Sequence, residues 1–160
     1  MVCRLLRTTS MDGRAAGAIS LRDRLLAEHA GIEFLLDEVI VAVEGGASAV
    51  VPWKRFSSAL LAQIDAEDGH LVTALPDDRS ARLLRHEHCY LRGRHSELGR
   101  AADRDELDAG ALRDFRDVLR AHARNDDRLL YCWAETHLDE RRRDIVFGAL
   151  TDRLSTTSER

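Results

Sequence analysis

The chain has 160 residues, is 44% hydrophobic and has a net charge of −4, which suits one soluble domain with a real core. Its acidic balance, with arginines mixed among the acids, argues against a dedicated nucleic-acid binder. No apolar run approaches the roughly 20 residues that cross a membrane. Three widely spaced cysteines without a CxxC pair favour a reduced compartment. We therefore expect a cytoplasmic protein with no nucleic-acid or membrane partner.

The first half of the chain predicts a flexible segment followed by two long helices. Residues 1–19 lack the apolar core of a secretion signal and are expected to be flexible. A helix is predicted over 20–43, because Ser20 has an acid three residues later and two glycines follow the end. A second helix is predicted over 52–74, with Pro52 in its first turn.

The second half predicts two further long helices and a shorter one. Asp77, Asp78 or Ser80 is expected to cap a helix that runs to about residue 100. Asp108 precedes a helix to about residue 137, and a shorter one covers about 140–153. These lengths predict an all-α fold, an antiparallel up-down four-helix bundle over 20–137. A short C-terminal helix and a frayed tail are expected over 138–160.

Polar residues interrupt the apolar seam that each long helix should bury. Buried polar groups are costly unless something satisfies them. Counting outwards from loops near residues 48, 77 and 105 places one polar residue of each helix at the same height. Histidines and carboxylates that meet from four helices are what a metal site in a bundle requires, and they suit iron, zinc or manganese. The inward polar residues are His29, Gln63, Glu67, His88, His122 and Asp126.

Four short motifs in chain order, AEHAGI, QIDAE, HEH and HARND, resemble the hemerythrin family in its HHE cation-binding form, over about residues 21–137. The resemblance implies a four-helix bundle that holds a non-haem di-iron centre. It implies a bridging role for Glu67, and it leaves Asp126 and Asp127 as alternatives for the carboxylate of the fourth helix. The metal ligands that it implies are His29, Glu67, His88, His122 and Asp126.

Two departures from the family pattern remove imidazoles. Gln63 stands where the family has a histidine and stays a possible, poorer ligand, and Arg92 stands where the oxygen carriers have a second histidine after His88. We therefore expect one or two irons, or another divalent metal, and a role in O2, NO or peroxide sensing or in iron handling rather than O2 transport. His70 could replace the imidazole lost at Gln63. Glu67 and His70 also match a ferritin-like spacing, although the other helices lack the necessary glutamates.

Other functions stay open at this point. The chain could be a metal-free interaction module, with the charge of Arg92 in place of iron, or a metal-dependent oxidase or peroxidase with a pocket near Leu84, Leu91 and Phe115. A haem-binding variant is a further alternative. The sequence identifies no protein partner and does not settle whether the chain is an enzyme. We expect Cys89 to be a buried small side chain, Cys132 to lie close to the seam, and Glu87 to have no part in the site.

Overall fold

The computed structural model describes residues 19–156, and no strand occurs among them. The all-α class is confirmed. The predicted flexible segment lies outside the described residues except for its last position, and so does the end of the predicted tail. The elements in chain order are α1 (Leu21–Glu44), α2 (Val50–Ala66), the π-turn η1 (Glu67–Leu71), the 3-10 turn η2 (Val72–Ala74), α3 (Asp78–Ala102), α4 (Ala109–Asp126), the π-turn η3 (Asp127–Tyr131), α5 (Cys132–His137) and α6 (Glu140–Thr156).

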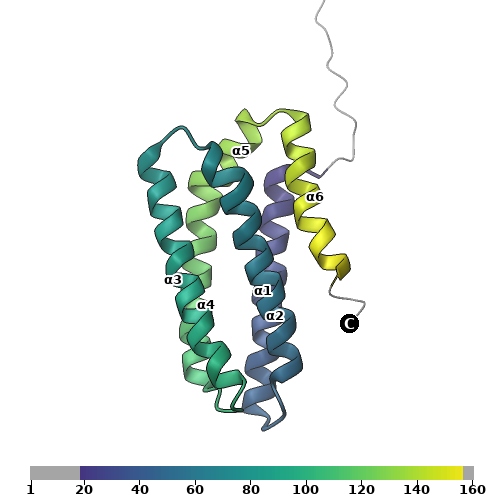
Figure 1. Cartoon of the computed structure of the whole chain (residues 1–160), viewed down its shortest axis with the longest axis vertical. Coiled ribbons are helices and arrows are strands. Elements are labelled where there is room, and N and C mark those ends of the chain that lie inside the picture. Colours follow the sequence, from purple (N-terminus) through teal and green to yellow (C-terminus); the bar gives the residue numbers. More distant parts are fainter. Residues whose placement is uncertain (1–18, 157–160) are drawn as a thin grey trace, which may run out of the picture.

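The long helices form columns that lie side by side (Figure 1). They are formed by α1, by α2 with η1 and η2, by α3, and by α4 with η3 and α5. The connections from α1 to α2 and from α3 to α4 lie at one end of the columns, and the connection from α2 to α3 lies at the other (Figure 1). Helix α6 packs outside the columns against α2 and η1. None of the described helices is both long enough and apolar enough to cross a membrane.

The helix starts follow the predicted capping residues. The Ser20 hydroxyl accepts a hydrogen bond from the Asp23 amide at 3.0 Å, and the Asp108 carboxylate accepts one from the Ala111 amide at 2.7 Å. Of the three residues considered for the third helix, Asp77 is the N-cap. Such caps satisfy amides that have no partner within the helix. Helix α2 begins two residues before the predicted start, with Pro52 in its first turn.

The buried apolar side chains form two clusters rather than one continuous core. One contains Ile32, Phe56, Leu91 and Phe115, and the other contains Leu25, Leu71, Leu84 and Leu130. In three columns the chain passes from one cluster to the other through a buried or nearly buried polar residue, and in the α2 column the buried Gln63 and Glu67 flank the passage. The polar residues therefore form a layer between two apolar regions, where water is largely excluded.

Two π-turns interrupt the helices that the sequence predicts as continuous. They cover Glu67–Leu71 and Asp127–Tyr131. Each π-turn is a single turn of π-helix, which holds one residue more than a turn of α-helix. Such turns often occur at functional sites. The extra residue shifts the buried face of the fourth column, so that Leu130 and Tyr131 are buried, whereas a continuous α-helix would turn Leu129 to that face. A buried carboxylate stands next to the start of each turn, since Glu67 is the first residue of η1 and Asp126 directly precedes η3.

Candidate metal centre

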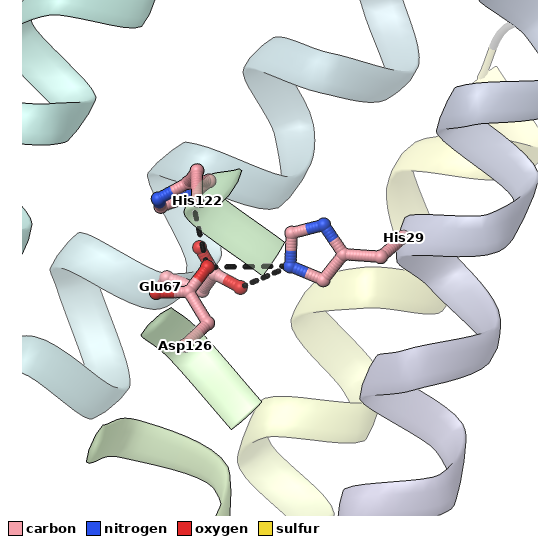
Figure 2. A group of neighbouring side chains, drawn as sticks. All are labelled: His29, Glu67, His122 and Asp126. Carbon is pink, nitrogen blue, oxygen red and sulfur yellow. Dashed lines mark ion pairs between the residues drawn. The ribbon is translucent and has the colours of Figure 1, made fainter. Parts of the chain in front are cut away.

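Four side chains from three columns meet in the polar layer (Figure 2). They are His29 from α1, Glu67 from the start of η1, and His122 and Asp126 from α4. One ligand atom of each lies within 4.8 Å of those of the others. Glu67, His122 and Asp126 are buried, and the side chain of His29 is 11% exposed. The group therefore has the residue types and the spacing to hold a metal ion.

Asp126 occupies the centre of this group. Its Oδ2 lies 2.8 Å from Nε2 of His122 and 3.3 Å from Nε2 of His29. The first pair is one helical turn apart, so both side chains share a face of α4. Nε2 of His29 also lies 3.6 Å from Oε1 of Glu67. Two imidazole nitrogens and two carboxylates thus point at one volume (Figure 2).

The remaining column, α3, contributes His88, which lies beside the group. Its Nε2 is 3.4 Å from Oε2 of Glu67, and its ring centroid is 4.9 Å from that of His122. Only 1% of the His88 side chain is exposed. Glu67 therefore has its two oxygens directed at histidines of different columns, Oε1 at His29 and Oε2 at His88.

Five buried polar atoms of this layer have no hydrogen-bond partner. They are Oε2 of Glu67, Nε2 of His88, Nε2 of His122, and both carboxylate oxygens of Asp126. The short contact between His122 and Asp126 does not have the geometry of a hydrogen bond. Leaving such a group unsatisfied costs about 1–3 kcal/mol, and five together call for an explanation. Cations bound in the layer would satisfy these atoms, and the nitrogen and oxygen donors suit a first-row transition metal.

Two carboxylates outside the layer hold the outer nitrogens of the histidines. Nδ1 of His88 lies 2.7 Å from Oδ1 of Asp68, and Nδ1 of His122 lies 3.1 Å from Oε2 of Glu87. When Nδ1 donates its proton to a carboxylate, Nε2 is left with a lone pair that faces the layer. Carboxylates in this position orient metal-binding histidines and make them more basic.

The prediction that Glu87 has no part in the site is wrong. In addition to the His122 contact, Oε1 of Glu87 accepts a hydrogen bond from Asn125 at 2.7 Å. Consecutive residues of a helix point about 100° apart, so the neighbour of an inward residue can reach an adjacent column. The HEH motif contains this signal, because Glu87 directly precedes the inward His88 and can therefore reach the neighbouring column.

Tyr131 is the site residue that the sequence analysis did not find. Its fully buried hydroxyl donates to Oε1 of Glu67 and lies 2.5 Å from Nε2 of His29. Burial, and then the negative charges of Glu67 and Asp126, raise the pKa of this phenol well above its usual value. The hydroxyl therefore keeps its proton at neutral pH. A continuous α-helix would not place residue 131 on the inward face, and η3 does.

Gln63 lies in the layer as a hydrogen-bond donor. Its side chain is buried, and its Nε2 donates to Oε1 of Glu67 at 2.6 Å and to the Tyr131 hydroxyl at 3.2 Å. The Gln63 amide thus holds the Glu67 carboxylate by a hydrogen bond, whereas the sequence left Gln63 open as a further metal ligand. Gln63 and Tyr131 together fix one oxygen of Glu67.

His70 and Asp127, the other two possible ligands from the sequence, lie outside the layer. His70 is exposed and lines an open surface cavity of about 530 Å³ with Arg142 and Ile145, so it does not replace the missing imidazole. Leu71 takes the buried position instead. Asp127 forms an ion pair with Arg22 at 2.6 Å, which ties α1 to the fourth column. Asp126 is therefore the carboxylate of the fourth column that faces the layer.

Arg92 and the two described cysteines also differ from expectation. The guanidinium of Arg92 pairs with Asp65 at 2.7 Å and lies 3.6 Å from Asp68, so its charge does not replace a metal ion. Instead, Arg92 supports the carboxylate that holds His88. Cys89 and Cys132 are free and exposed, so Cys89 is not a buried side chain and Cys132 lies off the buried seam.

The electrostatics of the layer couple its histidines to its carboxylates. Burial lowers the pKa of His29, but the facing carboxylates of Asp126 and Glu67 outweigh burial and raise it to about 10. His88 responds in the same way to Glu67 and Asp68, with a pKa of about 9. Burial favours the neutral form of Glu67, but His29 and His88 outweigh it and hold the pKa well below its usual value. In the absence of metal, protonated histidines thus neutralise the buried acids.

This coupling predicts an alkaline loss of stability in the metal-free protein. A pKa raised from 6.5 to about 9 or 10 stabilises the fold fully below pH 6.5, and the contribution disappears as the pH rises through the folded values. We expect the melting temperature of chelator-treated protein to fall by roughly 5–10 °C between pH 6.5 and 10. Melting curves across this range test it. A flat profile would mean that the histidines do not neutralise the buried carboxylates.

Comparisons with protein-family models, curated proteins and solved structures give no match. The geometry of the layer and the chemistry of its residues are therefore the basis for a functional assignment.

Proposed function

We propose that this protein binds iron in the layer between its two apolar clusters, as a cytoplasmic non-haem iron protein of the hemerythrin type with an up-down four-helix bundle. The observation that carries the proposal is the set of five buried polar atoms without partners. They converge from three columns, and a cation is the simplest group that satisfies both carboxylate oxygens and imidazole nitrogens at once. Free, exposed cysteines agree with a reducing compartment.

The ligands fall into two sets around Glu67. His29, Glu67, His122 and Asp126 would hold one ion, because their ligand atoms lie within 4.8 Å of one another. His88 and Oε2 of Glu67 offer donors to a second ion, with Glu67 as the bridge. Three imidazoles and two carboxylates provide fewer donors than two irons require, so an open coordination position is expected.

An iron with an open position would bind a small diatomic molecule or peroxide, and this favours sensing of O2, NO or peroxide, or iron handling. The chain supplies a proton donor at the same place. The Tyr131 hydroxyl stays protonated, lies 2.5 Å from Nε2 of His29 and donates to Glu67. Water has little access, because Glu67 and Asp126 are fully buried. These features suit selective binding of a small ligand more than turnover of a large substrate.

Metal content is the direct test of the proposal. Chelator-treated protein is loaded anaerobically with Fe(II), freed of excess iron, and analysed by mass spectrometry of the metal. One or two irons per chain are expected, and Zn(II) and Mn(II) loaded in parallel establish the preference of the site. Failure to retain any of these metals would overturn the proposal and favour a metal-free interaction module.

The Asp68 carboxylate is expected to strengthen metal binding without touching the metal. Asp68→Asn weakens the hold on Nδ1 of His88, and loss of such a partner typically lowers metal affinity 10–100-fold. Asp65→Asn is the matched control, since Asp65 also pairs with Arg92, whereas the carboxylate on Nδ1 of His88 is that of Asp68. Iron titrations of both variants measure the effect. Equal affinities would show that His88 is not a ligand.

A further inference from the structure

A hollow of about 240 Å³ opens between α3 and α4 on the outer side of the metal layer. Its rim is formed by the exposed residues His86, Tyr90 and Ala121, and its apolar walls by Leu91 and Val118. The polar residues Glu87 and His122 complete the lining. The hollow thus leads from the surface to the imidazole–carboxylate pair that borders the layer.

The lining contains buried as well as exposed groups. Leu91 is fully buried and His122 is 3% exposed, whereas Tyr90 is 50% exposed. A molecule in the hollow would therefore lose much of its contact with water, which favours apolar occupants. The volume sets the size of the occupant, because an apolar cavity of about 150 Å³ holds benzene. One aromatic ring with a small substituent fits.

Glu87 is the polar group able to fix such a molecule. Its Oε1 accepts a hydrogen bond from Asn125, and its Oε2 contacts Nδ1 of His122. A carboxylate has about four acceptor positions, so these two contacts leave capacity for one more donor. The negative charge of Glu87 disfavours an anion. The hollow is complementary to a neutral ring that carries one O–H donor.

We propose that this hollow binds a small neutral aromatic alcohol of about the size of phenol, which lays its ring between Leu91, Val118 and Tyr90 and donates its hydroxyl proton in a hydrogen bond to Glu87. The binding does not require a metal. A second consequence rests on the proposed iron-binding function. Because Glu87 also holds His122, occupation of the hollow would change the iron affinity of the layer.

The binding is tested on metal-free, full-length protein. Phenol is titrated in and followed by the amide signals of α3 and α4, with an expected dissociation constant of about 1 mM for a ligand of this size. Toluene has the same number of heavy atoms and no donor, so it should bind about tenfold more weakly. Absence of phenol binding, or equal affinities for the two compounds, would overturn the proposal.

Two variants in which an alanine is replaced by leucine locate the site. Ala121→Leu fills the rim of the hollow and should weaken phenol binding at least tenfold. Ala30→Leu makes the same change at an exposed position of α1 and should leave binding unchanged. Unaltered phenol binding in Ala121→Leu would overturn the location. Coupling is measured separately, by iron titration with and without saturating phenol. An unchanged iron affinity would overturn only the link to the metal layer, whereas failure to bind iron would count against the proposed function alone.

Discussion

Iron is expected to stabilise this fold strongly, and His122→Ala to remove that stabilisation. A ligand present at about a thousand times its dissociation constant raises the free energy of unfolding by about 4 kcal/mol. For a chain of this size that corresponds to a rise in melting temperature of roughly 8–16 °C. The source of the gain is the layer itself, where five buried atoms lack partners. Removal of one central ligand should lower the affinity enough to abolish the shift.

The comparison is made within each variant, between iron-free and iron-loaded samples. His122→Ala will also destabilise the metal-free protein, because it removes a group that faces the buried carboxylate of Asp126. The iron-dependent shift does not include this baseline cost. His86→Ala is the matched control, since His86 is exposed on α3 and should keep the full shift. An undiminished shift in His122→Ala would place the metal elsewhere.

The polar layer could be predicted from the sequence because turn and capping residues mark the loops between the helices. Asp77 and Asp108 cap two helices, Gly45 follows the end of the first, and the loop centres were placed next to these residues. Counting along straight helices from these loops then brings His29 and Glu67 to the same height, and the structure has their facing atoms 3.6 Å apart. This reasoning needs only the rise per residue and the alternating direction of the columns.

The same reasoning fails where a helix departs from its period. Nothing in the residues around Asp127–Tyr131 marks a π-turn, and an uninterrupted helix places Leu129 inward and Tyr131 outside the layer. The extra residue of η3 reverses this, and with it Tyr131 enters the site. Roles that depend on side-chain reach, such as the contact of Glu87 with His122, likewise depend on distances between columns. Periodicity alone does not provide those distances.

Phe56→Ala is expected to have the largest effect on stability outside the polar layer. The ring is completely buried, meets Phe115 edge to face at 6.1 Å and lies 5.4 Å from Trp53. Truncation of a buried phenylalanine costs about 3–5 kcal/mol, because apolar contacts are lost and a cavity remains. Chemical denaturation of the metal-free protein measures this cost. A loss below about 1 kcal/mol would mean that the cluster collapses around the missing ring.

Phe34→Ala is the matched control for this substitution. Phe34 lies on α1 with 63% of its surface exposed, so its truncation should change the free energy of unfolding by no more than about 0.5 kcal/mol. Both variants retain every residue of the polar layer. The iron-dependent stabilisation should therefore add to the altered baseline of each variant, as independent sites do. If Phe56→Ala also lost this increment, the apolar cluster would be required to hold the ligands in place, and core and metal site would act as one unit.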